Sequence, residues 1–198
     1  MAAPADDERG RIIDAAHRVL TASRGQNVSV TEVLREAGLS TRAFYRHFDS
    51  KDALVLAMVQ QEYAAMRRRL DSVVAAAASP PDAVRAWVAE FLRVASSTRR
   101  RQRARVLSSD EVTRAKGYAE VRREHYRDQI TALAEVLDRG RRDGSFPLAD
   151  PEPDARSLSA AISQAFEDQM RGVATGSAEE AAEQIGDFAF RALGVPRA

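Results

Sequence analysis

The fold of this chain is decided by the stretch SVTEVLREAGLSTRAFYRHFDSK at residues 29–51. Its apolar residues recur at spacings of three and four, which predicts two short helices joined at Ala37-Gly38-Leu39. Gly38 stands where a sharp turn between helices needs a positive φ, a conformation that glycine adopts without steric cost. We therefore predict a helix-turn-helix, in which the first helix crosses the DNA backbone and the second enters the major groove.

The second of these helices, expected over residues 40–48, has one apolar side and one polar side. Phe44 and Phe48 lie four residues apart and are expected to anchor the helix to the core. An arginine on the other side can bond a guanine edge twice, and a threonine can meet a base or a methyl group. Tyrosine, histidine and lysine suit phosphate contacts, which the free amides of helix starts can supplement. The predicted DNA-binding residues are Ser29, Thr31, Ser40, Thr41, Arg42, Tyr45, Arg46, His47 and Lys51. The alternative is a structural hairpin whose aromatic residues are simply core.

Three segments of this region match a known family: 37–40 (AGLS), 44–48 (FYRHF) and 50–54 (SKDAL). Together they make the chain, from about Arg9 to Met58, resemble the tetracycline-repressor-type (TetR-like) regulators. The resemblance implies a dimer whose third helix from each subunit enters successive major grooves. It also implies that Tyr45, His47 and Lys51 hold the DNA backbone while Thr41, Arg42 and Arg46 face bases.

Two positions depart from the family pattern. Gln26 stands where such proteins often have an aromatic residue, so the packing of the first turn is expected to differ. Arg42 stands where a small residue or proline is common, so no relative's base preference can be transferred to this chain.

Helical spacing continues along almost the whole chain, and alternating strand-like runs are nearly absent, which predicts an all-α fold. The first helix is expected to be capped by Asp6 or Asp7 and to stop at Gly25. Serines are expected to cap the next three helices: Ser29 in a capping box with Glu32, then Ser40, then Ser50.

Longer helices are expected from Lys51 onward. The first is broken at Pro80-Pro81, the second restarts at Asp82, and a third follows Ser108-Ser109-Asp110 and reaches Arg139, with Gly140 beyond it. Glycines and prolines predict a loop over residues 140–154, and the last helices are expected at 158–173 and 178–193. We predict a helix-turn-helix domain over 1–51 and a helical effector-binding and dimerisation domain over 52–198.

Composition narrows the function classes. Charged residues make up 30% of the 198 residues but leave a formal net charge of only +1, so DNA binding has to come from a local arrangement. The chain has no cysteine, which excludes disulfides and thiolate metal sites. The first residues do not read as a signal peptide, and no apolar run approaches the ~18 residues of a membrane span, so we expect a soluble cytoplasmic protein.

Enzyme motifs are missing. The three histidines, His17, His47 and His125, are scattered without metal-ligand spacing, and there is no phosphate-binding loop, nucleophile elbow or dinucleotide fingerprint. We predict no enzymatic activity, no cofactor and no metal.

An effector pocket is predicted in the helical domain, because several large residues fall on inward helix faces and a large apolar cavity with a few polar anchors is typical of small-molecule sites. His125 and Gln129 lie in the middle of an apolar stripe and are the expected anchors, although His125 could instead be an ordinary core histidine. The predicted lining is Tyr63, Met66, Trp87, Phe91, Tyr118, His125, Gln129 and Phe166.

The last two helices each carry an apolar stripe. Burial within the subunit explains such stripes, but the resemblance favours a four-helix dimer interface with two helices from each chain. The predicted interface residues are Leu158, Ile162, Ala165, Ile185, Phe188 and Ala189.

Arginines occupy positions 99, 100, 101, 103 and 105. This basic segment fits a solvated surface, extra attraction for the DNA backbone, or a site for a phosphate-bearing effector. The sequence leaves these three interpretations open.

The predicted function is that of a homodimeric transcriptional regulator, a repressor released from a pseudo-palindromic operator by a small, largely apolar effector. One rival is a constitutive DNA-binding or architectural protein, which would show no saturable ligand binding. The other is a helical ligand carrier or enzyme, which would show no sequence-specific DNA binding.

Overall fold

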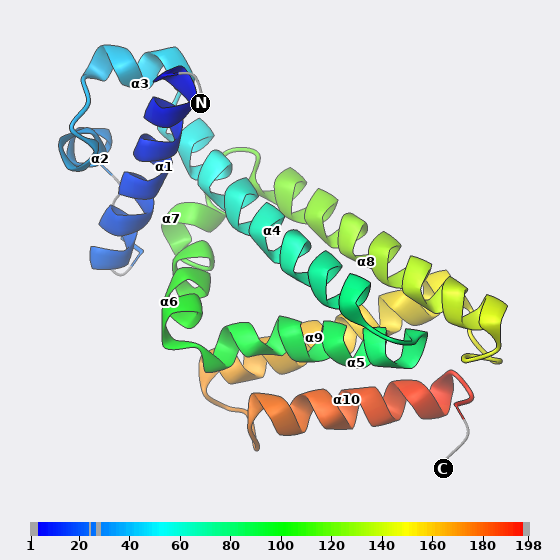
Figure 1. Cartoon of the computed structure of the whole chain (residues 1–198). Helices are drawn as coiled ribbons and strands as arrows, with labels where there is room; N and C mark the ends of the chain where they lie inside the picture. Colours follow the sequence, from blue (N-terminus) through cyan, green and yellow to red (C-terminus); the bar gives the residue numbers. More distant parts are fainter. Residues whose placement is uncertain (1–3, 24, 27–28, 196–198) are drawn as a thin grey trace. The chain divides into compact units, whose positions relative to one another are not determined.

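A computed structural model describes residues 4–23, 25–26 and 29–195, apart from the side chains of residues 4–7, 98 and 99. These residues form ten α-helices and no strand, which confirms the predicted all-α fold (Figure 1). The helices are α1 Pro4–Ala22, α2 Val30–Ala37, α3 Thr41–His47, α4 Lys51–Ala76, α5 Pro80–Ser96, α6 Thr98–Leu107, α7 Asp110–Thr113, α8 Tyr118–Asp143, α9 Pro151–Arg171 and α10 Ala178–Ala192.

The chain divides into two compact units. We call residues 1–64 with 102–123 the N-terminal unit, and residues 65–101 with 124–198 the C-terminal unit. Helices α4, α6 and α8 each contribute residues to both units. The domain boundary predicted at residue 51 separates the chain by function, whereas these units separate it by how its residues pack. That boundary stays a prediction.

The N-terminal unit is built around α1, which α2 and α3 both contact. Its core is a cluster of apolar side chains from these helices and from α4, α6 and α7, so the helix-turn-helix is packed on several sides. Members of this cluster that are almost completely buried include Ile12, Leu20, Phe44, Leu54 and Met58. The burial of these side chains removes large apolar surfaces from water. It also stabilises α2 and α3, which are too short to be stable helices on their own.

Several predicted helix ends are confirmed. Gly25 has φ 83° and its N–H donates to the carbonyl of Leu20 at 2.7 Å, which ends α1. The hydroxyl of Ser40 accepts a hydrogen bond from the Ala43 amide at 3.3 Å, and that of Ser50 accepts one from the Ala53 amide at 3.0 Å. These two serines therefore cap α3 and α4.

Two predicted caps are wrong. Ser29 occupies the N-cap position of α2, but its side chain makes no capping hydrogen bond, so the expected capping box is absent. Asp6 and Asp7 lie inside α1, because that helix already begins at Pro4. Proline is well tolerated in a first turn, where its missing N–H is not needed.

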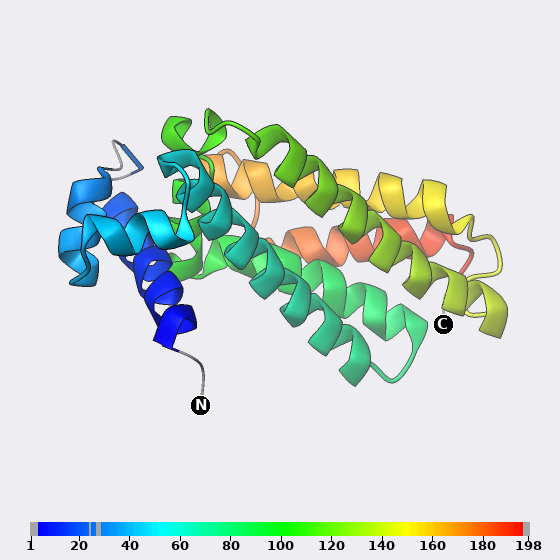
Figure 2. The same cartoon turned by 90° about the horizontal axis from the view of Figure 1, so that it is seen from above.

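In the C-terminal unit, α5 packs against both α9 and α10, and these two helices also contact each other. Figure 2 shows α9 and α10 running beside each other for most of their length. Apolar side chains from α4, α5, α8, α9 and α10 form the core of this unit. Its almost completely buried members include Leu70, Leu92, Leu133, Leu137 and Ile162.

Three breaks expected in this unit are placed differently. Pro80 and Pro81 do not precede α5 but form its first turn, after Ser79, whose hydroxyl accepts from the Asp82 amide at 3.3 Å. Gly140 lies inside α8 rather than after it, and the Phe146 ring packs so closely there that a Cβ on residue 140 would lie 2.0 Å from Cδ2 of that ring.

The expected loop is correspondingly shorter than residues 140–154, since α8 ends at Asp143 and α9 begins at Pro151. The basic segment is also more regular than expected, because it forms α6. In the part of the chain that the structure describes, no helix combines the length and apolar character needed to cross a membrane.

Candidate nucleic-acid interface and effector site

The turn of the helix-turn-helix is fixed by backbone contacts. Gly38 adopts the left-handed conformation at φ 64° and ψ 39°, as its position predicted. The Leu39 amide donates to the Leu34 carbonyl at 3.0 Å, and a guanidinium nitrogen of Arg11 donates to the Ala37 carbonyl at 2.7 Å. Orphaned carbonyls at the end of α2 are thereby satisfied, and the start of α3 is held at a defined angle.

Helix α3 has the two sides that the sequence predicted. Phe44 and Phe48 are 1% and 4% exposed, and their ring centroids lie 5.6 Å apart. Tyr45 is 65% exposed, with its ring edge-on to Phe44 at 5.3 Å. Thr41, Arg42 and Arg46 are also exposed. The buried aromatic pair thus leaves one side of α3 free to enter a groove.

The cations of this region differ in their partners. Glu8 on α1 accepts from Arg46 at 2.9 Å and lies 3.2 Å from the His47 Nε2, while the Lys51 ammonium lies 2.6 Å from Glu111. Arg42 has no ion pair within the described residues, so its guanidinium is available to a base. Sequence reasoning missed Glu8 and Glu111, because no local pattern links carboxylates so distant in the chain to these cations.

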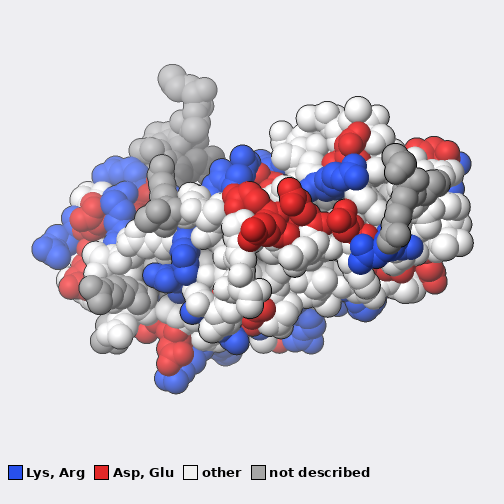
Figure 3. Space-filling view, turned by 90° about the horizontal axis from the view of Figure 1, so that it is seen from below, with Lys and Arg blue, Asp and Glu red and all other residues white. Residues whose placement is uncertain are grey.

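The remaining predicted DNA contacts lie at helix starts. Ser29 precedes α2 and is partly buried, Thr31 is exposed in its first turn, and Ser40 is exposed at the N-cap of α3. The face shown in Figure 3 carries both acidic and basic side chains, and a group of the acidic ones forms a patch on it. Because the overall charge is so balanced, any attraction to DNA would have to come from a local group of cations, such as those of α3 and the start of α4.

The predicted effector residues are divided between the two units. Tyr63 and Tyr118 belong to the N-terminal unit, where burial and the neighbouring Tyr118 raise the pKa of Tyr63. The others belong to the C-terminal unit. There Trp87 is 2% exposed, and the rings of Phe91 and Phe166 meet edge-on at 5.8 Å.

The two expected polar anchors lie one turn apart on α8. Gln129 is 7% exposed, and its amide nitrogen Nε2 finds no hydrogen-bond acceptor among the described residues. Burial lowers the pKa of His125 to about 4, against the opposing effect of Asp128 and with a smaller contribution from Arg67. His125 is therefore neutral at pH 7 and can donate or accept a hydrogen bond.

A cleft of about 360 Å³ also opens in the C-terminal unit. Trp87 is the one predicted effector residue on its wall, and most of the rest is charged. Its lining is Arg67, Asp71, Val74, Trp87, Ala132, Glu135, Val136, Asp138, Arg139 and Arg142. Sequence reasoning missed this cleft, because its charged residues occur at spacings that are typical of solvated helix faces.

The predicted dimer residues are not equally accessible. Leu158, Ile162 and Ala189 are buried in the core of their own subunit, and Ala165 and Ile185 pack partly against it. Phe188 is different, because it is 57% exposed on α10. Among the predicted residues it offers the large apolar surface that a partner subunit could cover.

Several side chains of the basic segment make specific contacts, unlike those of a segment that is simply solvated. The side chains of Arg100 and Arg103 are paired with Glu90 and Glu62, and Arg101 donates to the carbonyl of Gln169 at 2.9 Å. Arg105 is exposed, and the side chain of Arg99 lies outside the described residues.

The low pKa of His125 predicts an acid-sensitive fold. In the unfolded chain this histidine binds a proton near its usual pKa of 6.5, but in the folded chain only near 4. Stability is therefore complete above pH 6.5 and falls as the pH drops toward 4, by up to about 3 kcal/mol. Urea unfolding at pH 7.5 and 4.5 should show a larger loss for the wild type than for His125→Gln. Equal losses would contradict this assignment.

Comparison with known proteins adds independent findings. The family profile described as "Bacterial regulatory proteins, tetR family" matches residues 12–58. An uncharacterised HTH-type transcriptional regulator of Mycobacterium tuberculosis is 31% identical over 84 residues, and this match spans 42% of each chain. The alignment therefore covers less than half of that relative's length.

Solved structures extend the similarity to the whole fold. A TetR-family transcriptional regulator from Rhodococcus superposes with a TM-score of 0.77 at 14% identity, covering 95% of this chain and 99% of that one. FadR of Bacillus subtilis, solved in complex with stearoyl-CoA, gives a TM-score of 0.74 at 13% identity, covering 92% and 98%. At these identities the likeness is one of fold.

Proposed function

Residues 12–58 match the family model of bacterial regulatory proteins of the tetR type, and we propose that the chain belongs to this family and is a repressor that reads a DNA operator with α3. One observation supports this most strongly: Phe44 in α3 and Phe48 at its C-cap are buried, whereas α3 exposes Thr41, Arg42, Tyr45 and Arg46. The family is one of regulators rather than enzymes, as the missing catalytic motifs predicted. We propose further that the protein acts in the cytoplasm, where its operator is accessible.

The proposed assembly is a homodimer on a pseudo-palindromic operator. Two copies of α3 would enter successive major grooves, with half-site centres ~34–36 Å apart or a multiple of that distance. Exposed Phe188 on α10 supports an interface there, since a large apolar side chain in water is a feature that association would remove.

The proposed effector is a small, largely apolar molecule held in the C-terminal domain. Support comes from the buried amide of Gln129, whose Nε2 has no acceptor in the described part of the chain. A buried donor without a partner is costly, and a ligand oxygen would satisfy it. FadR, which shares the fold, was solved with an acyl-CoA and shows that this architecture can hold a ligand with a long apolar chain.

Release from DNA would be a two-state coupling. Helix α4 begins at Lys51, beside the helix-turn-helix in the chain, and continues to Ala76, so it can transmit a change from one domain to the other. The effector must prefer the state that does not fit DNA, and moving a 1:99 balance to 99:1 takes ~5.5 kcal/mol.

The test is operator binding by the purified protein. DNA that flanks its own gene is searched for inverted repeats, and each repeat is compared with a scrambled duplex at equal ionic strength, because salt alone changes affinity strongly. Tighter binding to one repeat is expected. Equal affinity for every repeat and its scrambled form would overturn the proposal and favour the carrier interpretation.

The effector part predicts a specific loss of ligand affinity. Apolar ligands that quench the single Trp87 are titrated against the wild type and His125→Ala, each checked for its fold by circular dichroism. The variant should bind about tenfold more weakly, which corresponds to the loss of one buried hydrogen bond of about 1.4 kcal/mol. His47→Ala, which removes a histidine outside the predicted pocket, is the matched control. Equal affinity in wild type and His125→Ala would contradict the anchor role.

A further inference from the structure

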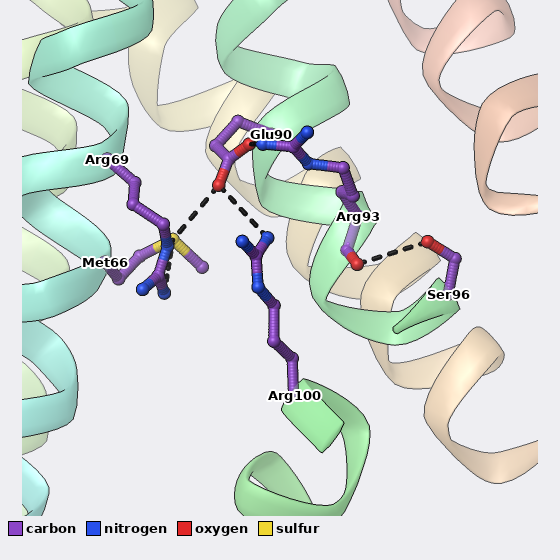
Figure 4. A network of polar contacts seen from close by, with 6 residues as sticks. All are labelled: Met66, Arg69, Glu90, Arg93, Ser96 and Arg100. Carbon is purple, nitrogen blue, oxygen red and sulfur yellow. Dashed lines mark hydrogen bonds and ion pairs between the residues drawn. The ribbon is translucent and has the colours of Figure 1, made fainter. Parts of the chain in front are cut away.

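A single buried carboxylate in the C-terminal unit is shared by three arginines. Glu90 on α5 is 3% exposed, and its Oε1 lies 3.4 Å from Arg69 Nε and 3.4 Å from Arg100 Nη1. Its other oxygen, Oε2, accepts a hydrogen bond from Arg93. Figure 4 shows these guanidinium groups converging on Glu90 from α4, from α5 and from the start of α6.

This arginine cluster, defined as Arg69, Arg93 and Arg100 around Glu90, has more donors than acceptors. Each guanidinium offers five N–H groups, whereas the carboxylate has about four lone-pair directions. Three positive charges against one negative charge leave the cluster with an excess of two. The Glu90 contact with Arg100 at 3.4 Å is also longer than a normal N–H···O bond, so Glu90 satisfies Arg100 only in part.

We propose that Arg69 and Arg100 bind the phosphoryl group of a small molecule. Their side chains are 32% and 35% exposed, so an anion can reach them, while Glu90 is almost fully enclosed and holds both in position. A guanidinium fork matches phosphate oxygens in geometry and charge. Arg100 also lies in the first turn of α6, which contains no acidic residue, so the helix dipole adds to the attraction.

The surroundings indicate what the rest of the ligand resembles. The Met66 thioether lies 3.9 Å from the Arg69 guanidinium, and Phe91 follows Glu90 directly on α5 and contacts Phe166. An amphipathic molecule could place its phosphoryl group at the arginines and its apolar body along Met66 and Phe91. This step rests on the proposed effector function, whereas the anion site itself does not.

The first experiment measures anion binding directly. Inorganic phosphate and pyrophosphate are titrated at low ionic strength by calorimetry against the wild type, Arg69→Gln, Arg100→Gln and the double variant. Saturable binding is expected in the wild type, with at least a tenfold loss in each single variant. The matched control is Arg171→Gln, which removes an exposed arginine paired with Glu167 on α9. Absence of saturable binding, or unchanged binding in the folded double variant, would overturn the site.

A second variant distinguishes an anion site from a purely structural ion-pair network. Glu90→Gln keeps the shape but removes the competing negative charge, so phosphate should bind at least tenfold more tightly. Phosphate should also raise the melting temperature of this variant more than that of the wild type, because bound ligand stabilises the folded state. Equal increases in both proteins would contradict the proposal. Folding of the variant only when phosphate is added would support the proposal.

A third comparison distinguishes a free anion from the head group of an effector. Octyl phosphate, inorganic phosphate and octanol are titrated against the wild type and the Arg69→Gln Arg100→Gln variant. Tighter binding of octyl phosphate than of phosphate, lost in the variant, supports an amphipathic effector. Equal binding of both phosphates supports a free-anion site, and octyl phosphate binding that is unchanged in the variant overturns the role of the arginines. Operator binding is measured separately, so the proposed function can fail while the anion site stands.

Discussion

The Arg42→Ala Arg46→Ala variant is expected to lose specific operator binding while keeping its fold. Both side chains are exposed on the polar side of α3, whereas the apolar residues that hold the helix lie on the opposite side. A good bidentate contact between arginine and guanine contributes about 1–3 kcal/mol of discrimination against the wrong base. The loss of two such contacts per subunit should weaken operator binding at least 100-fold, as measured by fluorescence anisotropy at fixed salt.

The control for this result is an arginine of similar exposure in another place. Arg123→Ala removes a cation that is paired with Glu120 at the start of α8, and it should leave operator affinity within about twofold of the wild type. Scrambled duplex is measured in parallel, because a phosphate contact weakens binding to every sequence, whereas a base contact weakens the operator selectively. A double variant that still prefers the operator as strongly as the wild type would refute the reading role of α3.

The parts of this fold that could be predicted from sequence are those that local chemistry determines. Gly38 requires a positive φ, Ser40 and Ser50 cap the helices that follow them, and Phe44 in α3 and Phe48 at its C-cap are both buried. Each depends on neighbours within four residues. For that reason the helix-turn-helix was predicted in detail, including which side of α3 is buried.

The errors arise where residues more than four positions away decide, or where the local sequence does not set the orientation of a side chain. Gly140 was expected to follow a helix, but the Phe146 ring needs the space that any side chain there would fill, and the helix continues past it. Ser29 was expected to cap α2, yet a capping sequence does not ensure that the hydroxyl turns toward the helix amides. Neighbouring residues could not have revealed either outcome.

The candidate sites show the same division. The cations of α3 were found from the sequence, but their partner Glu8 lies on α1, 38 residues from Arg46. Arg100 was noted as part of a basic segment, but its pairing with Glu90 depends on how α5 meets α6. The run of arginines therefore indicated where in the chain a charged site could lie. What these arginines can bind depends on the carboxylate that the fold places beside them.

Replacement of Phe188 by glutamate is expected to convert the proposed dimer into monomers. Phe188 is 57% exposed on α10, so in one subunit the glutamate meets water and the fold is preserved. Across a two-fold interface the same change buries two like charges without partners, which costs far more than a typical surface substitution. Sedimentation of wild type and variant at micromolar concentration measures the change in mass directly.

Operator binding by Phe188→Glu should then fall by orders of magnitude, although α3 is untouched, because each monomer reads only one half-site and the gain from simultaneous engagement is lost. Leu148→Glu is the matched control: Leu148 is 70% exposed in the segment between α8 and α9, outside the predicted interface. That variant should remain dimeric and bind the operator as the wild type does. A dimeric Phe188→Glu protein with full operator affinity would place the interface on another surface.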